Sequence, residues 1–144
     1  MFYIKLLNFG SCNIDYVYAV DHIVKAGETL SSISMNKFVG GKGLNQSVAI
    51  ENADAEVYHA GCIGNDGEML RTFLQRCGAN VAYLKTVPES SGHAIIQVSQ
   101  CGENSIVIYS GANSCITKEY IDTVLSDFEA GDLLVLQNEI SNVD

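Results

Sequence analysis

The stretch that decides the fold is the glycine-rich turn GGKGLNQ at residues 40–46. It leads into a predicted helix at residues 44–52, with Leu44, Val48 and Ala49 on one side. The N-terminus of a helix offers unpaired N–H groups and a partial positive charge, so it can bind an anion or a polar group of a ligand. A tight connection between a strand and a helix explains the same glycines equally well.

Two common nucleotide-binding motifs do not fit this turn. A Walker A loop requires a glycine five residues before its Gly-Lys pair and a Ser or Thr after the lysine. Those positions hold Asn36, or Phe38 if the count slips, and Gly43. A dinucleotide-binding fingerprint requires a third glycine where Gln46 stands. The spacing therefore argues against a nucleotide-binding α/β protein that carries either of these two motifs.

A second polar segment, GSCNID at residues 10–15, follows a predicted buried strand at residues 3–9. Ligands of open α/β sheets bind beyond the carboxyl ends of the strands. Asn13 and Asp15 alternate, so both side chains can point the same way. A carboxylate beside an amide suits adjacent sugar hydroxyls, because the carboxylate accepts and the amide can both donate and accept. An Asx turn that closes the strand is the alternative interpretation.

The rest of the chain alternates between predicted strands and helices, which indicates an α/β domain with a mostly parallel sheet and flanking helices. Further strands are expected at residues 56–63, 81–85 and 133–136. A second helix is expected at 68–77, where Gly78 ends it. A third is expected to begin after Thr117, its N-cap, and to bury the side formed by Tyr120, Ile121, Val124, Leu125 and Phe128. The run at 133–136 is wholly apolar, so we expect it to be buried on both faces. Residues 94–98 and 105–109 predict a hairpin.

Composition and charge narrow the classes of function. Of the 144 residues 47% are apolar and one is proline, which is typical of a packed domain. The net charge of −9 and the lack of a basic run argue against nucleic-acid binding. No window of about 18 apolar residues predicts a membrane span. The start of the chain does not resemble a signal peptide, so we expect a cytoplasmic protein.

The cysteines and histidines suggest no catalytic centre. Five cysteines without a CxxC pair suit neither a zinc site nor a disulfide scaffold, so we expect buried free thiols. The three histidines are scattered, and none belongs to a motif with a Ser or Cys nucleophile. Structural or surface roles are the expected ones for His22, His59 and His93.

Taken together, the segments at 10–15 and 40–46 resemble the ribokinase-like carbohydrate kinase family. That family opens with a strand and a GSxNxD segment, continues with a β-lid, and then begins a helix with GGKGxNQ. Further agreement follows in order at GCIGNDG (61–67), GAN (111–113) and QNE (137–139), so the resemblance covers essentially the whole chain. With Lys42, the glycine-rich turn looks closer to ribokinases than to fructokinases.

The resemblance implies a role for particular residues. Positions that hold the sugar hydroxyls are matched by Asn13, Asp15, Gly41, Lys42, Asn45 and Glu139. The chain would be the N-terminal, substrate-binding part, 1–144, of a partial Rossmann-like domain, with a small β-lid formed by segments at about 16–38 and 94–109. The small molecule that it binds would be a pentose, with D-ribose as the first candidate. The lid would also form the contact of a homodimer. Deoxyribose, other pentoses and a nucleoside stay open.

The residues that would catalyse phosphoryl transfer are not among these. In the family, the catalytic base is an Asp of a GAGD motif at the start of a later helix, and the ATP site lies in the same later region. The AGD at residues 130–132 follows a predicted helix and has Glu129 in place of the first Gly, so we expect Asp132 to be a turn residue.

The resemblance therefore implies a divided function. ATP, Mg²⁺ and a monovalent cation would act in the intact enzyme, and none of them is expected to bind this fragment well. The C-terminal, ATP-binding and catalytic part would be absent, and the 144 residues alone are expected to lack kinase activity. The alternative is a non-catalytic sugar-binding or dimerisation module. Without the later part of the family's sheet, the apolar strand at 133–136 would lack covering helices or a neighbour, and its exposed edge would make the chain marginally stable and prone to association.

Overall fold

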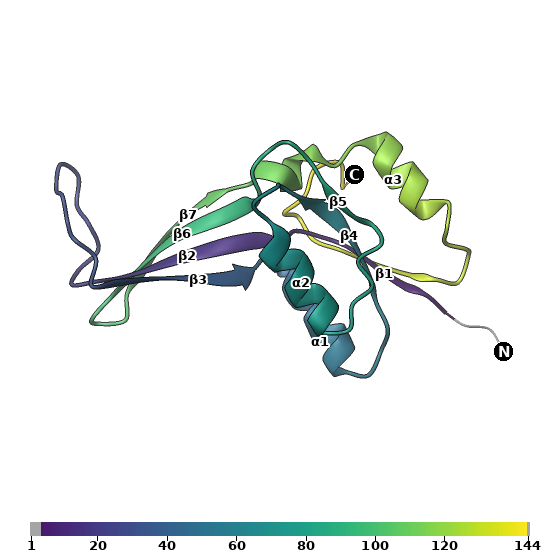
Figure 1. Cartoon of the computed structure of the whole chain (residues 1–144), viewed down its shortest axis with the longest axis horizontal. Helices are drawn as coiled ribbons and strands as arrows, with labels where there is room; N and C mark the ends of the chain where they lie inside the picture. The colour runs from purple at the N-terminus through teal and green to yellow at the C-terminus, as the bar shows by residue number, and fades with distance from the viewer. Residues whose placement is uncertain (1–3, 144) are drawn as a thin grey trace.

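The computed structural model describes residues 4–143 and arranges them as two sheets with helices around one of them (Figure 1). The first sheet has the order β5-β4-β1-β8, with β1 at Leu6–Phe9, β4 at Tyr58–Ile63, β5 at Leu84–Thr86 and β8 at Leu133–Leu136. All three pairings in it are parallel. The expected α/β class with a mostly parallel sheet is confirmed.

The second sheet has the order β3-β2-β6-β7 and extends away from the body of the molecule (Figure 1). Its strands are β2 (Asn13–Val20), β3 (Ser34–Gly40), β6 (Gly92–Ser99) and β7 (Asn104–Tyr109). Strands β6 and β7 form the predicted antiparallel hairpin, whereas β2 and β6 run parallel. The segment between β2 and β3, residues 21–33, is a long loop within the expected lid segment 16–38.

Three α-helices and one 3₁₀ helix accompany the first sheet. They are α1 (Lys42–Asn52), α2 (Glu68–Arg76), α3 (Lys118–Leu125) and the 3₁₀ helix η1 (Gly111–Cys115). Gly78, with φ of 104°, follows the end of α2 as expected. The hydroxyl of Thr117 accepts a hydrogen bond of 3.2 Å from the Tyr120 N–H, which confirms the predicted N-cap of α3.

The core consists of two apolar clusters. One joins α1 and α2 to the sheet, with Leu44, Leu70 and Leu74 at its centre. The other joins α3 and η1 to the sheet through Phe9 and Val124. Helices therefore cover both faces of the parallel sheet, as in other α/β folds. No helix in the described part of the chain has the length and apolar character needed to cross a membrane.

Several expectations about burial were wrong. On α1 the buried side is formed by Gly43, Leu44 and Ser47, and Ala49 is exposed, because the helix begins at Lys42 and turns Ser47 inward. The cysteines are all free, but Cys101 lies exposed in the turn between β6 and β7. In α3, Leu125 is 38% exposed.

Strand β8 has the exposed edge that the resemblance implied, and it is not buried as its apolar sequence alone predicted. Leu133, Leu134 and Leu136 were expected to be buried and are 55%, 49% and 42% exposed. Within residues 4–143, β8 pairs only with β1 and so forms an edge of the sheet. An apolar run indicates a strand suited to burial on both faces, but it cannot show whether the covering elements belong to the same residues.

Candidate functional site

The glycine-rich turn packs directly against the end of β1. Leu44 N–H donates to Ser11 O at 2.9 Å, and Gly43 N–H donates to Ser11 Oγ at 3.2 Å. A Cβ atom added to Gly43 would lie 2.4 Å from the backbone nitrogen of Ser11, and one added to Gly10 would lie 2.6 Å from Gly43 Cα. Side chains at either position would separate the strand from the helix, so the tight-connection interpretation of the glycines is correct.

Glu139 reaches the same helix N-terminus from the turn after β8. Its Oε2 accepts from the backbone N–H of Lys42 at 3.1 Å and from Ser11 Oγ at 2.8 Å. Its Oε1 pairs with Lys42 Nζ at 2.5 Å. Gly41, the N-cap of α1, has no side chain to cap the helix, so the carboxylate of Glu139 fills that role from a distant part of the chain. Burial opposes ionisation of Glu139, but the hydrogen bonds from Lys42 and Ser11 outweigh it and lower its pKa.

Asn13 and Asp15 begin β2 and lie two residues apart, so their side chains project from the same face. In the sheet, Asn13 is flanked by Gly40 on β3 and Gly92 on β6. A Cβ on Gly40 would lie 2.3 Å from Asp15 Oδ2, and one on Gly92 would lie 2.4 Å from Asn13 Oδ1. The two glycines therefore provide the space that these polar side chains occupy.

The carboxylates of Asp15 and Glu139 influence each other. Burial, and then the negative charge of Glu139, raise the pKa of Asp15. Glu139 is compensated by Lys42, whereas the structure gives Asp15 no cationic partner among the described residues. The site therefore holds one paired carboxylate and one carboxylate that would gain from a hydrogen-bond donor.

The structure gathers most of the predicted site residues at one place, where β2 and α1 begin. Gly41 has φ of 98°, and a Cβ there would lie 2.8 Å from Ser11 O. Asn45 lies one turn further along α1 with its side chain exposed, and its N–H donates to Gly41 O at 3.0 Å. The predicted positions therefore converge, although they come from both ends of the sequence.

A buried polar network behind the turn was not predicted. Asn8 Nδ2 donates to Gly43 O at 2.7 Å and to Ser47 Oγ at 2.8 Å. His59 contacts Ser47 Oγ through Nδ1 at 2.8 Å and Cys12 Sγ through Nε2 at 3.1 Å. Burial lowers the pKa of His59 to about 4, so its ring is neutral at pH 7. The structural role expected for this histidine is confirmed.

Asn113 and Ser91 also support the site, and sequence reasoning gave neither a role. Asn113 bonds the backbone of Cys12 and the side chain of Asn13. Ser91 donates to Asp66 Oδ1 from its N–H at 2.8 Å and from its hydroxyl at 2.7 Å, which fixes the 64–67 turn against the start of β6. The GAN motif at 111–113 was a usable signal for Asn113.

Asp132 is the turn residue that its surroundings predicted. Its Oδ1 accepts from the Lys5 N–H at 2.9 Å, and its Oδ2 accepts from the Glu129 N–H at 2.8 Å. These two backbone hydrogen bonds, that from Glu129 first, lower the pKa of Asp132. Both oxygens are thus occupied in closing the turn between α3 and β8.

Other features of the described residues lie away from this place. A hollow of about 280 Å³ lies beside the 21–33 loop, lined by Tyr18, Val20, Val24, Leu30, Ser32, Ile95 and Gln97. It contains none of the predicted sugar-binding residues, and Tyr18 lies on the face of β2 opposite Asp15. Within residues 4–143, no group of three or more His, Cys, Asp or Glu side chains is placed to hold a metal ion.

Comparisons with known proteins identify the family of the chain and its relatives. Residues 4–144 match the sequence model of a protein family described as "pfkB family carbohydrate kinase". The chain is 37% identical over 133 residues to a ribokinase of Haemophilus influenzae, covering 90% of the chain and 44% of that protein. It is 36% identical over 134 residues to a deoxyribokinase of Salmonella typhi, covering 91% of the chain and 44% of that protein.

Solved structures give the same result. A ribokinase of Arabidopsis thaliana in complex with ribose and ATP superposes with a TM-score of 0.81 at 29% identity, covering 96% of the chain and 46% of that protein. The chain thus spans less than half of the length of the relatives that it matches.

Proposed function

Because the chain belongs to the pfkB family of carbohydrate kinases, we propose that it forms the sugar-binding part of an ATP-dependent kinase whose substrate is D-ribose. The observation that carries the proposal is the convergence of Asn13, Asp15, Lys42 and Glu139 at the start of α1. The ribokinase relatives and the ribose complex of one solved neighbour support ribose as the sugar.

The chemistry of the converging side chains suits a polyhydroxyl ligand. Asp15 can accept hydrogen bonds from hydroxyl groups, and its pKa is raised by burial and then by the negative charge of Glu139. The side chain of Lys42 is 70% exposed although it is paired, so its ammonium can donate to a ligand while it stays near Glu139. A pentose offers both donors and acceptors, and it can therefore satisfy the carboxylates and the ammonium together.

In the proposed intact enzyme, ATP would supply the phosphoryl group that is transferred to the C5 hydroxyl of ribose, with release of ADP and of the hydroxyl proton, and Mg²⁺ would offset the charge on the phosphates. This chain's own residues would bind and orient the sugar. We assign none of ATP, Mg²⁺ and a monovalent cation to them, because the GAGD motif is not in the sequence. The 144 residues alone should therefore lack kinase activity.

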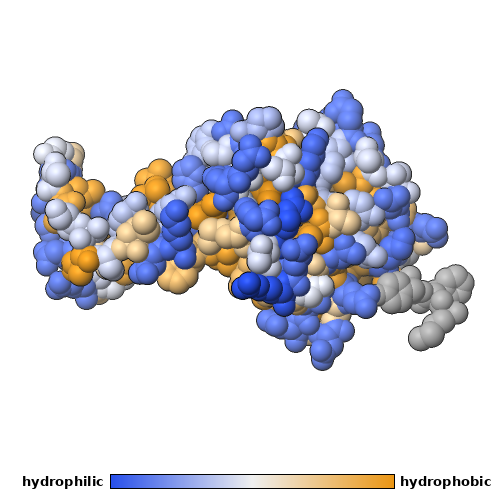
Figure 2. All heavy atoms as spheres, in the orientation of Figure 1, coloured by the Kyte–Doolittle hydropathy of each residue, from blue (hydrophilic) through white to orange (hydrophobic). Residues whose placement is uncertain are grey.

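We further propose that the β3-β2-β6-β7 sheet forms a homodimer as well as a lid over the sugar. Phe38, Ile106 and Ile108 are 54%, 50% and 60% exposed and share the face of Asp15 by register. Figure 2 shows apolar surface on this projecting part. Exposed apolar patches of this kind mark interaction sites, and a second copy would cover them.

The free cysteines fit a cytoplasmic location.

Calorimetric titration of the 144-residue chain with D-ribose and with 2-deoxy-D-ribose tests the sugar site. We expect saturable binding that is lost in Asp15→Ala, with ribose favoured over deoxyribose. Binding of neither sugar, in a chain that is folded and dimeric by sedimentation, would instead support the non-catalytic dimerisation module. Ribose-dependent ATP turnover above background by the purified chain would contradict the expected lack of kinase activity.

A further inference from the structure

The side chain of Asn113 has only one possible orientation. Its Oδ1 accepts from the backbone N–H of Cys12 at 3.0 Å, and its Nδ2 donates to the backbone carbonyl of Cys12 at 3.2 Å. Asn113 is 2% exposed. Because a backbone N–H can only donate and a carbonyl can only accept, a flipped amide would place two donors and two acceptors face to face.

This fixed amide determines the orientation of Asn13. The same Nδ2 of Asn113 donates to Asn13 Oδ1 at 2.8 Å. One proton of the Asn113 amide thus bonds Cys12 O and the other bonds Asn13 Oδ1. If Asn13 were flipped, its NH₂ group would face the NH₂ group of Asn113. The oxygen of Asn13 is therefore committed, and its nitrogen is the end that remains for a ligand.

The nitrogen of Asn13 is not fully buried, although the residue as a whole is only 7% exposed. Every fully buried side-chain N or O atom among the described residues has a hydrogen-bond partner. Asn13 is bonded there through Oδ1, and its Nδ2 makes no bond within residues 4–143. Gly40 and Gly92 flank Asn13, and the space that their side chains would need is filled by the side chains of Asp15, Asn13 and Asn113.

We propose that Asn113 is a positioning residue that makes Asn13 a pure hydrogen-bond donor toward the sugar. This inference rests on the proposed function of the site. A hydroxyl that contacts both Asn13 and Asp15 must then give its proton to the Asp15 carboxylate and accept from the Asn13 amide. The site would bind a ribose hydroxyl in one direction and would reject a group that cannot both donate and accept.

The orientation can be tested without any sugar. Side-chain NH₂ resonances of both residues are assigned by NMR in the 144-residue chain, and their exchange with solvent is measured. We expect slow exchange for Asn113, because both of its amide protons are bonded, and at least tenfold faster exchange for Asn13. Protection of the Asn13 amide and fast exchange of the Asn113 amide would overturn the inference.

Ribose is then added to the same sample. The expected result is that saturating ribose slows exchange of the Asn13 NH₂ protons and shifts their resonances, and leaves the exchange of the Asn113 protons unchanged. Saturable ribose binding that leaves the Asn13 amide unaffected would overturn the donor role. If no ribose binds, the proposed sugar function fails, and the sugar-free measurement still decides how Asn13 is oriented.

Asn113→Ala tests the positioning role. Release of the Asn13 amide should weaken ribose binding roughly 3- to 10-fold, since one side chain must then be ordered by the ligand. Thr117→Ala, which removes the N-cap of α3, is the control for lost stability and should leave ribose affinity unchanged. Equal ribose affinity of the Asn113→Ala and unmodified chains would contradict positioning. Should Asn113→Ala not fold, the two exchange measurements on the unmodified chain decide the question.

Discussion

The carboxylate of Glu139 lies across the N-terminus of α1, where Oε1 is 2.5 Å from Lys42 Nζ and Oε2 is 3.1 Å from the backbone nitrogen of Lys42. Ser11 Oγ completes the contact at 2.8 Å. One carboxylate thus joins the turn after β8, the start of α1 and the end of β1. The Glu139 carboxylate, to which the family resemblance gives a role in binding a sugar hydroxyl, therefore also caps α1.

Glu139→Gln should therefore reduce stability and sugar affinity together. An amide keeps one acceptor but loses the charge at the helix N-terminus, so we expect a loss of about 1 kcal/mol in the free energy of unfolding. Ribose affinity should fall by roughly tenfold or more, because Lys42 and Ser11 lose their shared anchor. Urea unfolding and calorimetry measure the two effects.

The matched control is Glu119→Gln, which removes a charge from the first turn of α3. It should leave ribose affinity unchanged.

The pH dependence of stability gives a second test. Because the pKa of Glu139 is lowered, the stability that its carboxylate contributes is fully present above the ordinary glutamate pKa, near 4.5, and is lost as pH falls through the lowered pKa. If Glu139→Gln showed the same dependence of unfolding on acid pH as the unsubstituted chain, the capping role would be contradicted.

Asp15→Asn should affect stability and binding in opposite directions. Burial and the charge of Glu139 raise the pKa of Asp15, so its ionised form weakens the ligand-free protein at pH 7. The amide relieves this, and a rise of roughly 1–2 °C in melting temperature is expected, small because the group is partly exposed. Ribose binding should be lost. Asp122→Asn, on α3, is the control for charge removal, and a lower melting temperature of Asp15→Asn would contradict the argument.

Ribose affinity of the unmodified chain should also depend on pH. The bound hydroxyl needs an ionised Asp15, so affinity should be constant at neutral pH and should fall as pH decreases through the raised pKa of this carboxyl. Calorimetry between pH 7.5 and 4.5 measures the profile. Stronger binding at acidic pH would show that Asp15 acts as a protonated donor instead.

Sequence reasoning named candidate residues that the structure brings together, because they lie in short motifs at strand and helix ends. The pattern of GGKGLNQ and GSCNID placed Lys42 and Asp15 correctly relative to a helix start and a strand. Contacts between distant segments were beyond it. That Ser47 turns inward to His59, or that Asn113 reaches Cys12, depends on helix rotation and strand order, which no local pattern specifies.

The exposure of β8 had a different reason. An apolar run such as 133–136 predicts a strand with apolar neighbours on both faces. Whether such neighbours are present depends on the position of the strand in the sheet, and within residues 4–143 strand β8 pairs only with β1. Leu133 shows the consequence, since it is 55% exposed at the edge of the parallel sheet.

Gly43→Ala tests the packing of α1 against β1 by the sign of its effect. Within a helix, replacement of Gly by Ala normally stabilises by about 1 kcal/mol. Here the added Cβ would lie 2.4 Å from Ser11 N and 2.5 Å from the carbonyl carbon of Gly10. We therefore expect a net loss of about 1–3 kcal/mol, measured by urea unfolding. A stabilised variant would show that the turn can relax away from the strand.

Ile106→Glu tests association through the β3-β2-β6-β7 sheet. Ile106 is 50% exposed on the face that also carries Asp15, so a buried charge there should weaken a dimer at least tenfold. Leu133→Glu places the same charge on the exposed edge strand β8 and is the matched control. Sedimentation equilibrium distinguishes the two, and weakening by Leu133→Glu alone would assign self-association to β8.

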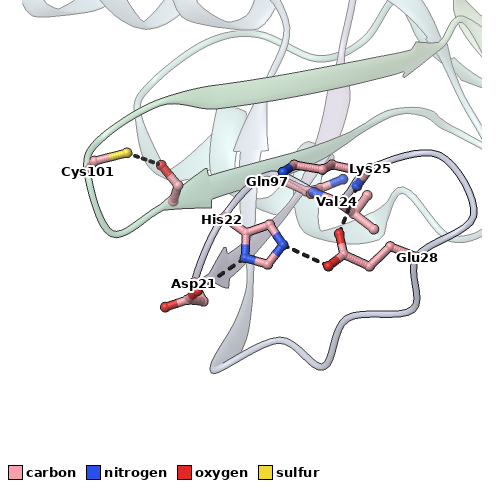
Figure 3. A network of polar contacts seen from close by, with 8 residues as sticks. Asp21, His22, Val24, Lys25, Glu28, Gln97 and Cys101 are labelled. Carbon is pink, nitrogen blue, oxygen red and sulfur yellow. Dashed lines mark hydrogen bonds and ion pairs between the residues drawn. The ribbon is translucent and has the colours of Figure 1, made fainter.

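The loop at 21–33 should become less protected as pH rises. His22 bridges Asp21 and Glu28 through its two ring nitrogens, at 3.1 and 2.9 Å, and Glu28 also accepts from Lys25 N–H at 3.0 Å (Figure 3). The hydrogen bond to Asp21, and then that to Glu28, raise the pKa of His22 above its ordinary value of 6.5. Both bonds are therefore complete below pH 6.5, and one of them is lost as pH rises through the raised pKa, because the neutral ring keeps a single N–H donor.

Amide hydrogen exchange measures this directly, once rates are corrected for their intrinsic dependence on pH. Protection of residues 21–33 should decrease between pH 6 and pH 8, whereas protection in β2 should stay constant. His22→Gln keeps a polar side chain without the titration and should remove the pH dependence. The bond from Val24 N–H to Gln97 Oε1, at 3.0 Å, does not titrate and should hold the base of the loop in both proteins. Equal pH dependence in His22→Gln would show that another group opens the loop.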